Sequence, residues 1–202
     1  MKTLHFISLI VFVLGITIST NAQDNNSLKN QSGVYKTFAD FLSKKLDLAV
    51  DVTKSTHKIK IHEFFNKSEI DVIHDDGKKY TFKKKDIYGV RDLNGNDFRF
   101  LYDQEYQIEQ ADIIFIYTKP ADYIVGGGKS QQTKHVTEYF FSKTGESEIL
   151  KLTLENTKEA FPENHKMHDA LDMMFKSESD LAEYDSFHKT FKVVRFLKEH
   201  LK

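Results

Sequence analysis

The sequence predicts an α+β fold, an antiparallel β-meander followed by two or three C-terminal helices packed on the sheet. A partly closed barrel is an alternative form of the meander. Between residues 57 and 152, apolar residues alternate with polar ones in short runs separated by turn residues. After residue 153 the apolar spacing becomes three and four, as in amphipathic helices. The composition, 40% hydrophobic and 29% charged, is typical of a globular protein.

The first 22 residues are expected to be a signal peptide. Lys2 precedes a mostly apolar run, Phe6 to Ile18, and small residues around Ala22 suit cleavage. This run is short for a membrane span, which takes about 20 residues. Polar residues 23–32 are expected to be a flexible tether, and residues 33–202 a single domain, mainly β in 33–152 and helical in 153–202. The mature protein is expected in the periplasm or outside the cell, without a span.

The chain has no cysteine. Disulfides, thiolate chemistry, zinc–thiolate sites and a cysteine-linked lipid anchor are therefore excluded. The net charge of −1 lacks the basic character of nucleic-acid-binding proteins, so no nucleic-acid partner is expected.

The domain should begin with a strand and a short helix over residues 33–42. Thr37 can cap that helix, with Phe38, Phe41 and Leu42 on one face. Eight or nine strands should follow, over residues 57–62, 70–74, 80–84, 87–91, 97–102, 105–109, 113–118, 135–142 and 146–152. Asp76-Gly77, Asn94-Gly95 and Lys143-Thr144-Gly145 provide turn signals. Asn94-Gly95 is the strongest, because a type I′ turn needs positive φ at both central residues.

Alternation indicates how the strands face. Phe98, Phe100 and Tyr102 are expected on one side with Arg99 on the other, and Tyr106 and Ile108 opposite a row of polar residues. The run from Ile113 to Tyr117 is apolar on both faces and therefore needs cover on both. The C-terminal helices are the expected cover.

Three helical segments are predicted after residue 153. Thr153 or Asn156 begins a helix that ends near Pro162, Asn164 can cap a second, and Ser177 with Asp180 forms a capping-box pattern. The last and longest helix should bury one apolar stripe against the sheet: Leu181, Tyr184, Phe187, Phe191, Val194, Leu197 and Leu201.

A glycine-rich stretch, Gly126-Gly127-Gly128-Lys129-Ser130, resembles the end of a phosphate-binding loop. The first glycine of that motif would fall at Tyr123, and a strand rather than a helix is expected afterwards, so the motif fails. Residues 120–134 are instead interpreted as a flexible loop. The candidate partner- or ligand-binding residues in it are Tyr123, Gly126, Gly127, Gly128 and Lys129.

One helical pattern could hold a metal ion. His165 and His168, with Asp172, would share a helix face at a spacing that suits a transition metal. The pattern lacks the H-E-x-x-H order of zinc proteases, and exposed histidines of this kind are common on helices. The metal site is therefore a minority hypothesis.

Nucleophilic catalysis has no support, since no G-x-S-x-G motif or cysteine occurs. The acidic pairs near Asp75 and Asp92 fit turn chemistry, although a glycosidase pair stays open because its carboxylates are set by space and not by sequence spacing. No catalytic residue and no cofactor is predicted.

Three segments carry a resemblance: GVYKTFADF, IYGVRDLNGNDFRFLYDQEYQI and LTLENTKEAFPENHKMHDAL. Together they are similar to a group of uncharacterised secreted proteins of Bacteroidetes-type bacteria. The resemblance implies export in a bacterial envelope and carries no catalytic residue or activity across.

The favoured function is an exported, non-catalytic binding or interaction module for a protein or small molecule. One alternative is a carrier of a small apolar ligand inside a curled sheet. Another is a metal-dependent hydrolase that uses His165 and His168.

Overall fold

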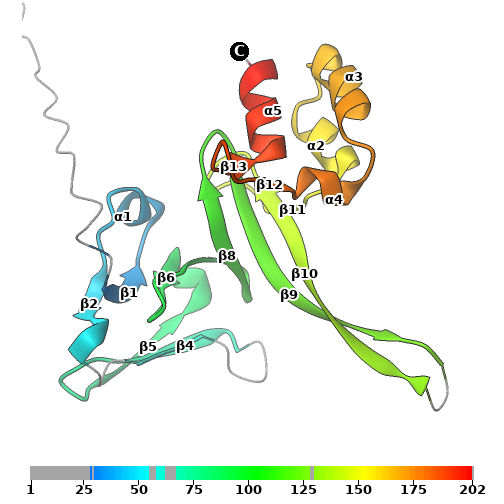
Figure 1. The fold of residues 1–202 in the computed structure, drawn as a ribbon. Helices are drawn as coiled ribbons and strands as arrows, with labels where there is room; N and C mark the ends of the chain where they lie inside the picture. Colours follow the sequence, from blue (N-terminus) through cyan, green and yellow to red (C-terminus); the bar gives the residue numbers. More distant parts are fainter. Residues whose placement is uncertain (1–27, 29, 55–57, 62–66, 128–129, 202) are drawn as a thin grey trace, which may run out of the picture.

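The computed structural model describes residues 28, 30–54, 58–61, 67–127 and 130–201. The fold is α+β, as predicted (Figure 1). The predicted signal peptide lies outside the described residues. None of the helices in the described residues has the length and apolar character needed to cross a membrane.

The elements follow in chain order: β1 (Gln31–Tyr35), α1 (Phe38–Leu42), β2 (Asp47–Asp51), η1 (Val52–Lys54), β3 (Lys58–Lys60), β4 (Glu69–Ile73), β5 (Lys79–Lys83), η2 (Lys84–Asp86), β6 (Gly89–Arg91), β7 (Asp97–Leu101), β8 (Gln104–Ala111), β9 (Phe115–Val125), β10 (Gln132–Ser142), β11 (Leu150–Lys151), α2 (Leu154–Ala160), α3 (His165–Met174), α4 (Glu178–Leu181), β12 (Tyr184–Asp185), β13 (Thr190–Phe191) and α5 (Lys192–His200). β1 begins inside the segment expected to be a tether, and Ser32 is fully buried.

Eight strands form one antiparallel sheet in the order β11-β10-β9-β8-β7-β6-β1-β2. Its consecutive strands β6 to β11 form the predicted meander. β11 and β2 lie at opposite ends of this order, so the described strands do not close into a barrel. Strands β3, β4 and β5, which were expected to continue the same meander, form a separate three-stranded sheet instead.

Two faces of the main sheet are covered by different layers. One face, here called the helix face, carries Ile116 and Phe141, which pack in one cluster with the C-terminal helices. The opposite face, here called the α1 face, carries Phe115 and Tyr117, which pack with Phe41 of α1. β9 is covered on both sides, as predicted, but the expected cover is wrong for one of them: the C-terminal helices cover the helix face, and α1 covers the other. Ile113, just before the strand, is 40% exposed.

The small sheet covers the other end of the helix face. Gln107 pairs with both Phe98 and Thr118, which places Phe98 on the helix face. Phe98 and Phe100 form a second cluster with Ile70 and Val72 of β4. The helix face thus has the small sheet at one end and the helices at the other, an arrangement visible in Figure 1.

Arg99 points to the α1 face, as the alternation predicted, but it is buried and not solvated. Its guanidinium donates to the Tyr117 hydroxyl at 3.0 Å and to the Ser147 carbonyl at 2.8 Å. These contacts fasten the segment after β10 to the sheet. The prediction for Tyr102 is wrong: it follows β7, has φ of 55°, and is 79% exposed.

The predicted hairpin at Asn94-Gly95 joins β6 to β7, but with a different turn. Gly95 has φ of 84°, whereas Asn94 is not among the described residues with positive φ. The Asp92 carboxylate accepts from the Asn94 and Asn96 amides at 2.8 and 2.7 Å. Asp92 thus stabilises a longer turn in which only the glycine needs the left-handed region.

The helix starts agree with the capping signals. Thr37, Thr153 and Asn164 each accept from a backbone amide in the first turn, and Ser177 with Asp180 forms the capping box of α4. These caps satisfy amides that have no partner within the helix.

The prediction of one long final helix is wrong. The apolar stripe is divided between α4, the β12–β13 hairpin and α5, and Phe187 at the hairpin tip is 87% exposed. The Asp185 carboxylate accepts from the Phe187 and His188 amides at 3.1 and 3.0 Å. Lys189 then has φ of 52°, so a turn replaces the helix.

Candidate functional site

The β9–β10 hairpin extends well past the sheet and forms a projecting arm (Figure 1). Its strands stay in register from Phe115 opposite Ser142 to Val125 opposite Gln132. Pairing of β9 with β8 reaches only Thr118. The part of the hairpin beyond this point, residues 120–137, is called the distal arm below.

The flexible-loop interpretation of residues 120–134 is therefore wrong. Most of these residues belong to paired strands, and the connection lies between Val125 and Gln132. Pro120 stands just beyond the β8 pairing, where an edge position tolerates a residue without an amide hydrogen. Gly126 has φ of 87° and its absent Cβ would lie 2.5 Å from the Ser130 carbonyl oxygen, so it marks the bend at the arm's end.

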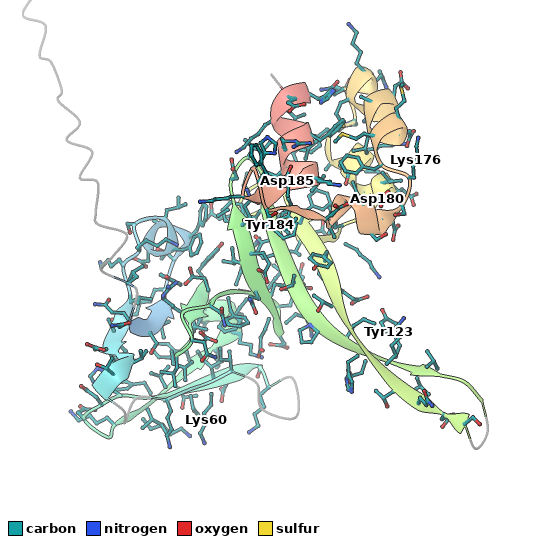
Figure 2. All side chains as sticks on the ribbon, viewed as in Figure 1. Lys60, Tyr123, Lys176, Asp180, Tyr184 and Asp185 are labelled. Atoms are coloured by element: carbon teal, nitrogen blue, oxygen red, sulfur yellow. The ribbon has the colours of Figure 1, made fainter. Side chains whose placement is uncertain are left out.

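Of the predicted binding residues, Tyr123 lies on the arm and Gly126 and Gly127 at its tip, while Gly128 and Lys129 lie outside the described residues. Figure 2 shows Tyr123 on the arm. The distal arm exposes three large apolar side chains in succession: Tyr123 at 46%, Ile124 at 72% and Val125 at 42%. Among its described residues, only Ala121 and Val136 are even half-buried.

Polar contacts orient the arm near its base. The Tyr123 hydroxyl donates to Glu138 at 2.5 Å, and the Lys151 ammonium pairs with the same carboxylate at 2.9 Å. These two donors lower the pKa of Glu138, and the Glu138 carboxylate in turn raises the pKa of Tyr123. Farther out, Asp122 pairs with His135 across the strands at 2.7 Å.

The predicted metal-ligating residues do share α3, but each is engaged differently. The His165 and His168 rings lie 5.7 Å apart, centroid to centroid. The His168 ring nitrogen Nε2 is 2.9 Å from the Phe161 carbonyl oxygen, and Asp172 pairs with Lys158 at 2.6 Å. Within the described residues, no group of three or more His, Asp or Glu side chains is placed to hold a metal ion. The metal site therefore stays a prediction, for which the described residues provide no set of ligands.

A groove on the helix face, near the base of the arm, was missed at the level of sequence. It has a volume of about 650 Å³ and is lined by Gln107, Glu109, Thr118, Thr137, Tyr139, Ala182, Tyr184 and Phe191. Its aromatic residues come from β10, β12 and β13. Alternation identifies such residues as strand positions but does not bring β12 and β13 next to β10.

Two buried polar side chains elsewhere, Lys84 and Tyr35, have structural partners. The Lys84 ammonium, buried to 1% exposure, pairs with Glu105 at 2.8 Å and contacts the Asp103 carbonyl. Tyr35 donates to Asp97 at 2.9 Å, and burial together with that carboxylate raises the pKa of Tyr35. These contacts join strands and do not form a cleft with a reactive group.

Comparison with known proteins returned no matching family model, curated protein or solved structure.

Proposed function

We propose that this chain is an exported, non-catalytic binding module that engages a protein partner through the distal arm. One observation carries the proposal: a paired ribbon projects beyond the sheet and exposes Tyr123, Ile124 and Val125 together. Because successive strand residues point to opposite faces, Tyr123 and Val125 are exposed on one face of the ribbon and Ile124 on the other. Exposed apolar surface that is more than scattered single residues is typical of interaction sites.

The arm is unfavourable for the stability and solubility of an isolated fold, which supports a role in binding. A two-stranded ribbon without a covering layer is marginally stable in water, and its free edges invite unwanted pairing. The cross-strand contacts Tyr123–Glu138 and Asp122–His135 hold the ribbon in one shape. A preorganised arm loses less entropy on binding than a flexible loop would.

Shortening the arm tests the proposal. Replacing residues 123–134 by the dipeptide Asn-Gly joins the paired residues Asp122 and His135 through a tight turn. Because the deleted residues that the structure describes contribute no buried side chain, the thermal midpoint should stay nearly unchanged. A photo-crosslinking residue at position 124 should give a discrete crosslinked protein in the source cell's envelope.

The matched control places the same crosslinker at Leu42, an apolar residue on α1 that is 60% exposed. Crosslinking at position 124 alone, competed by the intact protein and not by the shortened one, agrees with the proposal. Equal crosslinking at both positions, or equal competition by both proteins, would contradict it.

A further inference from the structure

The groove near the base of the arm contains three aromatic rings, of which Phe191 contacts the other two. The Tyr139 and Phe191 ring centroids lie 6.1 Å apart with planes at 67°, and those of Tyr184 and Phe191 lie 5.3 Å apart with planes at 80°. Phe191 is buried between the other two, whereas Tyr184 is 52% exposed. Figure 2 places Tyr184 at the foot of the helical layer. Rings that meet at steep angles present both faces and edges to the space they border.

A single carboxylate accompanies these rings. Glu109 is the one formally charged side chain among the residues that line the groove. The Thr118 hydroxyl, also in the lining, donates to one Glu109 oxygen at 2.6 Å. This hydrogen bond holds the carboxylate against the groove wall.

Three basic side chains of α5, the helix that follows Phe191, pair with carboxylates other than Glu109. Lys192 pairs with Glu183 at 2.6 Å, Arg195 with Asp185 at 2.6 Å, and Lys198 with Asp112 at 2.5 Å. These three basic side chains therefore do not neutralise Glu109 in the structure. The groove lining thus combines three aromatic residues with one carboxylate.

We propose that this groove binds a small organic cation that carries a quaternary or alkylated ammonium group. Aromatic faces attract such cations through their quadrupole, and alkylammonium groups also gain from contact with apolar surface. The volume falls in the range of small-ligand sites, roughly 300–1,000 Å³. A neutral apolar ligand would desolvate Glu109 without compensation, and an anion would be repelled by it.

Choline and its uncharged isostere 3,3-dimethylbutan-1-ol provide the test, with calorimetric titration of the intact protein. Both have the same shape, so the difference in affinity isolates the positive charge. Choline should bind at least about tenfold more tightly, a difference expected for a cation over a partly desolvated aromatic site. Equal affinities, or no saturable choline binding, would overturn the proposal.

Variants locate the site. Tyr184→Phe keeps the ring and should keep choline affinity, whereas Tyr184→Ala should weaken it about tenfold and Glu109→Gln several-fold. Both positions are exposed, so the fold should tolerate these changes. Tyr102→Ala, at an exposed tyrosine outside the groove lining, is the control and should bind as the parent does. If Tyr184→Ala and Glu109→Gln both retain parental affinity, the assignment fails.

This test is independent of the arm. None of the groove residues falls within 123–134, so the shortened protein should bind choline with parental affinity. Loss of partner crosslinking and loss of choline binding are thus separate outcomes.

Discussion

The two halves of the β9–β10 hairpin share one register but have opposite surroundings. At the base, Ile116 pairs with Phe141 and Tyr117 with Phe140, and layers cover both faces of the sheet. In the distal arm, Ile124 pairs with Thr133 and neither face is covered. The backbone pairing is the same, so what differs is the apolar area removed from water. The base therefore belongs to the core, and the distal arm is free to serve as a contact surface.

The largest expected difference between the halves comes from truncating one apolar side chain in each. Phe141→Ala empties a fully buried position and should lower the free energy of unfolding by about 3–5 kcal/mol. Ile124→Ala removes a side chain that is 72% exposed and should change it by less than about 0.5 kcal/mol. Urea denaturation of both variants measures the difference. A large loss from Ile124→Ala would show that the distal arm is packed in solution.

Buried tyrosines in and next to the main sheet should make the stability of the fold depend on high pH. Burial raises the pKa values of Tyr35, Tyr88 and Tyr117 above the ordinary value near 10. The unfolded chain loses these protons first. The stability that the three groups contribute is therefore complete below about pH 10 and falls above it, by about 1.4 kcal/mol per pH unit for each tyrosine.

Tyr88→Phe isolates one of these groups. The Tyr88 hydroxyl is buried and has no hydrogen-bond partner in the structure, so its removal should leave stability at neutral pH unchanged or slightly higher. The loss of stability above pH 10 should become shallower by about 1.4 kcal/mol per pH unit. Tyr102→Phe, at a tyrosine that is 79% exposed, is the control and should leave the loss of stability above pH 10 as it is. If the loss of stability above pH 10 is unchanged in Tyr88→Phe, the Tyr88 hydroxyl is not buried in solution.

The same contrast explains which parts of the fold were predictable from sequence. The base of β9 was recognised because five successive apolar residues, Ile113 to Tyr117, predicted a strand that needs cover on both faces. The capping residues Thr37, Thr153 and Asn164 were recognised because their chemistry is local. In each case the decisive interaction involves burial or nearby residues.

The distal arm was missed because its pairing leaves no burial pattern. Pro120 and three glycines suggested a loop, while the strands are held by backbone hydrogen bonds that any sequence can make. The β12–β13 hairpin was missed for the opposite reason. Its apolar residues keep a helical spacing, and the turn depends on one side chain, Asp185. The groove could not be predicted, because Tyr139 of β10 meets Tyr184 and Phe191 of the β12–β13 hairpin only in the folded chain.

Two glycines, Gly145 just after β10 and Gly126 at the arm's tip, allow a further comparison. A Cβ at Gly145 would lie 2.0 Å from the Phe38 ring, which packs against Phe115 at 5.9 Å between centroids. Gly145→Ala must displace that ring and should cost about 1–3 kcal/mol in urea denaturation. Gly126→Ala meets the Ser130 carbonyl and a positive φ, so its strain is confined to the tip.

Gly126→Ala should therefore change global stability by less than about 0.5 kcal/mol, because the distal arm can open without exposing the core. Its effect should appear as faster amide hydrogen exchange in residues 120–137, with exchange at the base of β9 and β10 unchanged. Gly145→Ala should show the reverse, with faster exchange around Phe115 and Tyr117. If Gly126→Ala lowers global stability as much as Gly145→Ala does, the arm folds as one cooperative unit with its base. The distinction between a base that belongs to the core and a distal arm that is free to bind would then be wrong.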